Sequence, residues 1–182
     1  IKRKVPDTEV SHYADEMIHQ VDRFVKMTQE VLDYSRGVSE LHIETLQLSE
    51  LMEGSLKFVE AHFQNRNITI IRKFLYPGAC NLDPEKMARV FYNLTGNAAD
   101  AMPNGGTLTV CTEKSDETIC ITFTDTGTGI PDGIKAKVLE PFFTHGKKHG
   151  TGLGLAIVKK IVDDHGGTIE IESRENVGTT IR

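Results

Sequence analysis

The chain has no tryptophan, only three cysteines among 182 residues, and no long apolar run. Cys80, Cys111 and Cys120 are widely spaced and form no CxxC pair, which favours buried thiols in a reducing compartment over a disulfide framework or a zinc site. No apolar stretch approaches the roughly 20 residues that cross a bilayer, and the N-terminus shows no signal-peptide pattern. We therefore expect a cytoplasmic fragment that makes no membrane contact itself, which leaves open whether its parent is membrane-anchored.

Positive charge is also scarce, because 21 Lys and Arg residues stand against 26 Asp and Glu, giving a formal net charge of −5. A protein of this charge has no dominant basic surface for nucleic-acid phosphates, so we predict no nucleic-acid partner. The apolar fraction of 38% is ordinary for a soluble globular domain with a proper core. The chain starts without Met and ends at Arg182 inside a predicted strand, so we expect a fragment of a longer protein.

The N-terminal part is predicted to be one long amphipathic helix. Between about Asp15 and Arg36, apolar residues such as Ile18 and Val21 recur at helical spacing with charges between them. A single helix has no core of its own, so this apolar face is expected to pack on another helix, in the same chain or in a second subunit. The alternative is that the helix folds back on the main domain.

Residues 38–182 form the predicted main domain, and residues 1–37 the helix unit. Asp83-Pro84-Glu85 is a strong helix start, since a capping carboxylate precedes a proline at the first helical position, and this helix is predicted to end near Ala101. The other predicted elements are helices from Ser49 to Phe63 and from Leu153 to His165, and strands at 67–71, 107–110, 118–124 and 168–172. This order predicts a two-layer α+β sandwich with a mixed, mostly antiparallel sheet and helices on one face.

Asn93, Asn97 and Asp100 lie at i, i+4 and i+7 of the helix after Pro84 and so share a face, away from its apolar stripe. The carbonyl oxygens of two amides one turn apart can bind a hard cation such as Mg²⁺, which takes its other ligands from water and substrate phosphates. Taken alone, such a pair is more commonly solvated surface.

Asp125 follows the strand 118–124 and continues the parity of Ile121 and Phe123, which places its carboxylate at the inner edge of the sheet. A carboxylate there needs a hydrogen-bond donor, and the exocyclic amine of adenine is one candidate. Gly127 and Gly129 come next, and their missing side chains would let a flat ring approach the backbone. Taken alone, Asp-Thr-Gly is also a common turn.

The segment from Gly150 to Leu155 lies where a loop becomes a helix, with glycine at 150, 152 and 154. Successive backbone N–H groups and the positive end of the helix dipole form a natural phosphate cradle. The preceding segment, Thr144 to His149, is polar and basic, and we interpret it as a lid. The sequence matches neither the P-loop nor a GxGxxG after a first strand, so the two commonest phosphate motifs are excluded.

With these clusters in this order, residues 41–182 resemble the ATP-binding catalytic domain of sensor histidine kinases, in the superfamily shared with type II topoisomerases and mismatch-repair ATPases. Five segments carry the resemblance: the N box (Asn93 to Asn97), the first glycine box (Asp125 to Gly129), the F box (Pro141-Phe142-Phe143), the second glycine box (Gly150 to Gly154) and the closing Gly-Thr element (Gly178-Thr179-Thr180).

The resemblance implies a role for each matching residue. Asn97 would bind Mg²⁺ with help from Asn93. Asp125 would accept a hydrogen bond from the adenine amine of ATP, and Thr179 would lie near the base. The other residues implied in ATP binding are Gly127, Gly129, Ile130, Thr144, Lys147, Lys148, Gly150, Thr151, Gly152, Leu153, Gly154 and Leu155, with the lid over the phosphates. Topoisomerase-type hydrolases have a water-activating glutamate where this chain has Asn93, a poor base, so Asn93 as the catalytic residue favours transfer of the γ-phosphoryl group over hydrolysis.

The N-terminal helix ends in Leu32-Asp33-Tyr34-Ser35-Arg36, which resembles the end of the second helix of the kinase dimerisation hairpin. The resemblance implies a homodimer through a four-helix bundle, and a response-regulator receiver domain as the partner that receives the phosphoryl group. The stretch from Asn97 to Pro103, with Gly105-Gly106 after it, is most similar to the nitrogen-regulation sensors.

The chain departs from the family pattern at two places. Asp100 stands where many of these kinases have a basic residue that meets phosphate, so charge neutralisation would fall to Mg²⁺ and to Lys147 or Lys148. Neither His12 nor His19 matches the acceptor-histidine box, so the acceptor is expected outside this chain. The sequence thus predicts an ATP-dependent histidine kinase fragment. The alternatives are an ATP-binding regulatory module without transfer activity and a protein serine kinase of the same superfamily.

Overall fold

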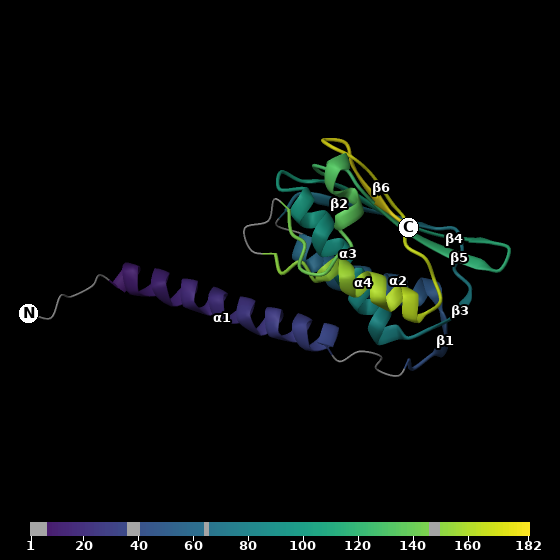
Figure 1. The fold of residues 1–182 in the computed structure, drawn as a ribbon, viewed down its shortest axis with the longest axis horizontal. Coiled ribbons are helices and arrows are strands. Elements are labelled where there is room, and N and C mark those ends of the chain that lie inside the picture. The colour runs from purple at the N-terminus through teal and green to yellow at the C-terminus, as the bar shows by residue number, and fades with distance from the viewer. Residues whose placement is uncertain (1–6, 36–40, 64–65, 146–149) are drawn as a thin grey trace, which may run out of the picture. The chain divides into compact units, whose positions relative to one another are not determined.

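The computed structural model describes residues 7–35, 41–63, 66–145 and 150–182 (Figure 1). The chain divides into two units, Ile1–Gly37 and Val38–Arg182. The first contains helix α1 (Asp7–Ser35), which confirms the predicted helix and starts nearer the N-terminus than expected. Its large apolar side chains are exposed, with Val21 at 60% and Phe24 at 70%. None of the described helices is long and apolar enough to cross a membrane.

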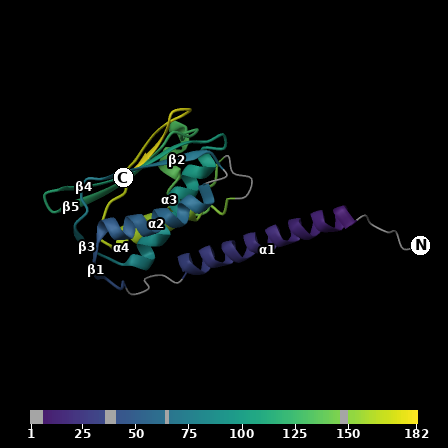
Figure 2. The same ribbon diagram turned by 180° about the vertical axis from the view of Figure 1, so that it is seen from behind.

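The second unit is a sheet covered on one face by helices. Its elements are β1 (Glu44–Gln47), α2 (Leu48–Phe63), β2 (Ile68–Phe74), β3 (Ala79–Leu82), α3 (Pro84–Ala101), β4 (Gly106–Ser115), β5 (Thr118–Asp125), the 3₁₀ helix η1 (Asp132–Lys137), α4 (Gly154–Asp164), β6 (Ile171–Arg174) and β7 (Gly178–Ile181). Among the described residues the main sheet has the order β2-β4-β5-β7-β6, in which β2 and β4 are parallel and the other neighbours antiparallel. Helices α2, α3 and α4 lie on one face (Figures 1 and 2), which confirms the predicted sandwich.

The apolar stripe of α3 attaches this helix to the sheet. Val90, Phe91 and Leu94 are at most 5% exposed, and the Phe91 ring centroid lies 5.4 Å from that of Phe123 on β5. Burial of large apolar side chains is the main favourable term in folding, so the stripe fixes the rotation of the helix about its axis. The polar face that carries Asn93 is therefore held in a defined direction.

The first turn of α3 is joined to the last turn of α4. The Asp83 carboxylate caps α3 by accepting from the backbone N–H of Lys86 and of His42, each at 3.0 Å. The Asp83 N–H donates to His165 Nε2 at 3.0 Å, so the neutral ring carries its proton on Nδ1, which lies 2.7 Å from the Ile161 carbonyl oxygen. Burial raises the pKa of the Asp83 carboxyl, but the backbone hydrogen bonds from Lys86 and His42, together with the positive charge of Lys86, outweigh it and hold that pKa below its ordinary value.

Several local features differ from the sequence predictions. Helix α2 begins at Leu48, one residue before the predicted start, so Ser49 lies in its first turn. The N–H groups of that turn are satisfied from elsewhere, because Leu48 donates to the Gly78 carbonyl and Ser49 to the Pro77 carbonyl. A second sheet of β1 and β3 was not predicted, and β6 begins at Ile171, later than expected.

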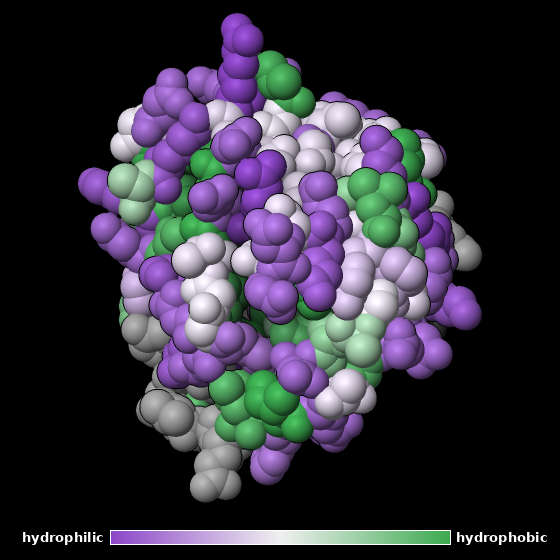
Figure 3. Space-filling view, turned by 90° about the vertical axis from the view of Figure 1, so that its right-hand side faces the viewer, coloured by the Kyte–Doolittle hydropathy of each residue, from purple (hydrophilic) through white to green (hydrophobic). Residues whose placement is uncertain are grey.

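The far end of the sheet is the tip of the β4–β5 hairpin, on the side of the molecule that Figure 3 presents. That view is mostly hydrophilic, with smaller hydrophobic areas. Residues 113–118, which form the tip, are all exposed, and Lys114 Nζ lies 5.5 Å from the centroid of the Tyr76 ring. This end of the sheet is therefore a solvated surface, and none of the predicted site residues lies there.

Candidate functional site

The two amides of α3 are half-buried and lie one turn apart. Asn93 Nδ2 donates to the Arg89 carbonyl oxygen at 2.9 Å, which fixes the orientation of the side-chain amide. Its Oδ1 is directed at the start of α4, since a Cβ placed on Gly154 would lie 3.0 Å from it. The predicted N box and second glycine box thus meet at Asn93 and Gly154, with a carbonyl oxygen of Asn93 facing the beginning of a helix.

The Asp125 carboxylate lies at the end of β5, opposite Thr179 on β7. Its Oδ1 accepts from the Gly127 N–H at 2.8 Å and from the Thr179 N–H at 3.3 Å. Within the described residues no hydrogen bond is made to Oδ2. Burial raises the pKa of this carboxyl above its ordinary value, and the two backbone hydrogen bonds only partly oppose the shift. One oxygen of a desolvated carboxylate is therefore left to accept from a ligand.

The glycines after Asp125 serve packing within the protein. A Cβ on Gly127 would lie 2.6 Å from the Ala101 carbonyl oxygen, and that oxygen accepts from the Thr128 N–H at 2.9 Å. Gly129 has φ +67°, and a Cβ there would collide with the Arg174 carbonyl. We expected the missing side chains to make room for a flat ring, but the freed space is filled by backbone. The first glycine box is thereby fixed to the C-terminal end of α3, one turn beyond Asn97.

Ser173 on β6 was not singled out in the sequence, but it connects two residues that were, Ile130 and Thr179. Its Oγ accepts from the Ile130 N–H at 2.8 Å, donates to the Gly178 carbonyl at 2.9 Å and lies 2.9 Å from Thr179 Oγ1. Ser173 belongs to no motif, and only the pairing of β6 with β7 places it here, so no signal in the sequence could have identified it.

The second glycine box precedes α4 and contacts the F box. Gly152 has φ +73°, its carbonyl accepts from the Phe142 N–H at 2.9 Å, and a Cβ on Gly152 would collide with the Phe142 backbone. The Leu153 side chain is buried at 1% exposure, and the Leu153 N–H donates to Thr151 Oγ1 at 3.4 Å. Leu155 is half-buried against the core.

The remaining predicted residues are distributed around this loop. Thr144 and Gly150 are exposed, whereas Lys147 and Lys148 lie outside the described residues. In the part of the chain that the structure describes, no three His, Cys, Asp or Glu side chains converge on one point. A cation held here would therefore depend on amide oxygens and on oxygens of its ligand.

The three predicted clusters thus surround one face of α3. Asn93 meets Gly154 of the second cluster, and Ala101 meets Gly127 beside Asp125. This arrangement offers an acceptor for a base at one end, amide oxygens in the middle, and backbone N–H groups of the α4 N-terminus at the other. Such a set suits a nucleotide with its phosphates directed at the start of α4.

Known proteins share this sequence and fold. Residues 82–182 match the family described as histidine kinase-, DNA gyrase B-, and HSP90-like ATPase. Sensor histidine kinase ZraS of Escherichia coli (strain K12) is 32% identical over 175 residues, 94% of this chain and 37% of ZraS. The catalytic domain of histidine kinase ThkA has a TM-score of 0.69 and 30% identity, over 77% of this chain and 92% of that domain. Histidine kinase ThkA in complex with response regulator protein TrrA has a TM-score of 0.80 and 26% identity, over 98% of this chain and 51% of that one.

The chain spans little more than a third of the length of ZraS. The family match, in contrast, covers residues 82–182 and so more than half of the 182 residues, including every cluster described above. On this basis the chain belongs to the histidine kinase-, DNA gyrase B-, and HSP90-like ATPase family, as an ATP-binding domain of the kind found in sensor histidine kinases.

Proposed function

We propose that this chain binds ATP with Mg²⁺ and donates the γ-phosphoryl group to a histidine of a protein. The observation that carries the proposal is the position of Asn93, whose carbonyl oxygen faces the start of α4 where phosphate is expected. In the transfer, the bond between the γ-phosphorus and the β–γ bridging oxygen breaks, ADP leaves, and a phosphorus–nitrogen bond forms on the imidazole. Catalysis of this kind rests on positioning and charge neutralisation.

In this proposal each described group has one task. Asp125 Oδ2 accepts from the adenine amine, Thr179 holds Oδ1 of the same carboxylate through its N–H, and the backbone from Gly150 to Gly154 donates to phosphate oxygens. Thr144, Lys147 and Lys148 belong to the proposed lid over the phosphates, and Gly127, Gly129 and Ile130 frame the base end.

Asn93 and Asn97 are suited to Mg²⁺. The Nδ2 of Asn93 is occupied by the Arg89 carbonyl, which leaves the hard oxygen Oδ1 facing the start of α4. Mg²⁺, when bound, neutralises phosphate charge. Asn93 has no proton-accepting group for activating water, because an amide is a very weak base, so the site supports transfer to a protein side chain better than hydrolysis.

The acceptor and the partners follow from the same proposal. The exposed apolar face of α1 suits a homodimer in which this helix, within residues 1–37, is part of a dimerisation hairpin, and residues 38–182 are the catalytic domain. We place the acceptor histidine outside this chain, the response-regulator aspartate downstream, and the fragment in the cytoplasm. The ThkA complex with TrrA supports a response-regulator partner. The Asn97 to Pro103 stretch supports the nitrogen-regulation group.

The test combines binding and transfer. Calorimetry with a non-hydrolysable ATP analogue and Mg²⁺ is expected to show binding by the wild type, and labelled ATP is expected to phosphorylate a separately supplied acceptor hairpin with an acid-labile product. Binding without labelling supports the regulatory module, and an acid-stable product supports a serine kinase. Absence of binding contradicts all three.

A further inference from the structure

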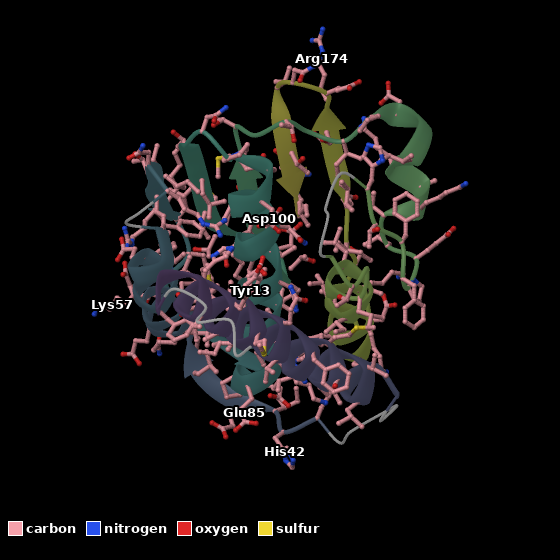
Figure 4. The ribbon with its side chains drawn as sticks, turned by 90° about the vertical axis from the view of Figure 1, so that its left-hand side faces the viewer. Tyr13, His42, Lys57, Glu85, Asp100 and Arg174 are labelled. Carbon is pink, nitrogen blue, oxygen red and sulfur yellow. The ribbon has the colours of Figure 1, made fainter. Side chains whose placement is uncertain are left out.

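Asp100 places a negative charge one turn beyond Asn97, the proposed Mg²⁺ ligand, on the polar face of α3. It stands three residues after Asn97 and seven after Asn93 on α3, so the three side chains share one face, with neighbouring Cβ atoms about 5–6 Å apart. Figure 4 shows Asp100 near the C-terminal part of α3. A carboxylate in this position repels the phosphates of a nucleotide, and a cation is needed to offset it.

Arg66, in the connection between α2 and β2, supplies that cation. Arg66 Nη1 lies 3.6 Å from Asp100 Oδ1, and the two side chains are 53% and 47% exposed. A guanidinium has five N–H donors, and one carboxylate at this distance leaves most of them available to a second anion. The half-exposed position means that a ligand can reach the group without rearrangement of the core.

The backbone that carries Arg66 is fixed to the end of α3. The Arg66 N–H donates to the Phe63 carbonyl at 2.9 Å, which closes the end of α2. Asn67 has φ +52°, and its carbonyl accepts from the Gly106 N–H at 3.1 Å. Gly105, just after α3, lies so close that a Cβ there would be 2.5 Å from the Asn67 oxygen. The turn is therefore held against the helix by backbone contacts.

We propose that Arg66 is a phosphate-binding residue of the nucleotide site, positioned by its ion pair with Asp100. This inference rests on the proposed function, since it requires a nucleotide on this face of α3. Arg66 supplies the positive charge that the sequence lacks at position 100, and it comes from a segment 34 positions earlier in the numbering. Asp100 orients the guanidinium, and the remaining donors meet phosphate oxygens, for which planar Arg is suited.

The experiment compares ligands that differ only in their phosphates. Calorimetry measures the affinities of adenosine, ADP and a non-hydrolysable ATP analogue for the wild type, Arg66→Met and Lys57→Met. ADP and the analogue are measured with Mg²⁺. Lys57→Met is the matched control, because it removes one exposed positive charge from α2, at a position well separated from Asp100 in Figure 4. Arg66→Met is expected to weaken ADP and the analogue about tenfold and to leave adenosine within about twofold, as for loss of one charge-assisted hydrogen bond. Lys57→Met is expected to change none of the three.

The double variant Arg66→Met with Asp100→Asn separates a phosphate contact from simple neutralisation of Asp100. If Arg66 contacts phosphate, the double variant stays about tenfold weaker than wild type. Recovery of wild-type affinity overturns the assignment, as do unchanged affinities in Arg66→Met or equal losses for adenosine and ADP. Arg66→Lys keeps the charge and serves if the Met variant unfolds. The Arg66→Lys variant is expected to lose part of the phosphate-dependent affinity. If its affinity equals that of the wild type, the result counts against the assignment. A wild type that binds no nucleotide overturns the proposed function itself, which is a distinguishable result.

Discussion

Replacing Asp125 by asparagine is expected to abolish most adenine recognition and leave the fold intact. The N–H groups of Gly127 and Thr179 both point at Oδ1, so the asparagine amide keeps its oxygen there and places its NH₂ where Oδ2 was. A donor then faces the adenine amine, which is also a donor. Loss of a charge-assisted acceptor costs about 1.5 kcal/mol and an unpaired buried donor costs about as much again, so affinity is expected to fall about 100-fold.

The assay for Asp125→Asn is calorimetry with adenosine, which contains the base but no phosphate. Thermal unfolding without ligand is the control, and the variant is expected to be no less stable than the wild type at pH 7. The reason is that burial raises the pKa of Asp125, so the charged form is disfavoured in the folded protein. Adenosine affinity equal to that of the wild type would refute the assignment of Oδ2 to the base.

The raised pKa of Asp125 also sets the sign of two pH effects. The folded state binds this proton more tightly than the unfolded state, so the favourable contribution to stability is present below the unfolded pKa of about 3.9 and is lost as pH rises through the folded pKa. Adenosine binding by the same carboxylate has the opposite pH dependence. Adenosine affinity of the wild type is expected to fall as pH is lowered through the raised pKa, and Asp125→Asn is expected to lack this dependence.

Three further substitutions test the site and its frame. Asn93→Ala is expected to weaken the affinity for an ATP analogue about tenfold with Mg²⁺ and hardly at all without it. Calorimetry in buffers with and without Mg²⁺ measures both affinities. Gly127→Ala is expected to destabilise the protein by about 1–3 kcal/mol in urea unfolding, because its Cβ would lie 2.6 Å from the carbonyl oxygen of Ala101, whereas Gly133→Ala has open space and stays near neutral. Asp83→Ala is expected to cost about 1–2 kcal/mol at pH 7, and since the folded pKa of Asp83 is lowered, the difference from wild type shrinks as pH falls below about 3.9.

The sequence predicted best what depends on neighbours along the chain. The cap at Asp83, the proline after it and the apolar spacing that follows are local signals, and α3 begins and ends where they indicate. The three site clusters were also found in sequence, because glycine and amide spacings are visible without knowing the fold. The structure places residues of all three clusters around α3, and the binding roles given to them stay predictions.

The features that were missed are contacts between distant segments. The pairing of β1 with β3 places Glu44 opposite Leu82. In neither strand do apolar and polar residues alternate strongly enough to predict the pairing. Ser173 and Arg66 belong to no motif. Pairing of β6 with β7 brings Ser173 to Thr179, and the turn after α2 brings Arg66 to Asp100. The role of Gly127 was misjudged for the same reason, since the atom that excludes a side chain there, the Ala101 oxygen, comes from another element.

The hydrogen bond from Asp83 to His165 gives the α3–α4 pair a second attachment, far along both helices from the meeting of Asn93 with Gly154. Because the two helices contact each other near both ends of their shared length, they move together. Their separation at one end therefore depends on the contact at the other. The spacing of α3 and α4 beside the proposed phosphate site thus depends in part on a histidine outside every nucleotide motif. Random mutagenesis that scores only nucleotide affinity should therefore return substitutions at His165 beside those in the glycine segments.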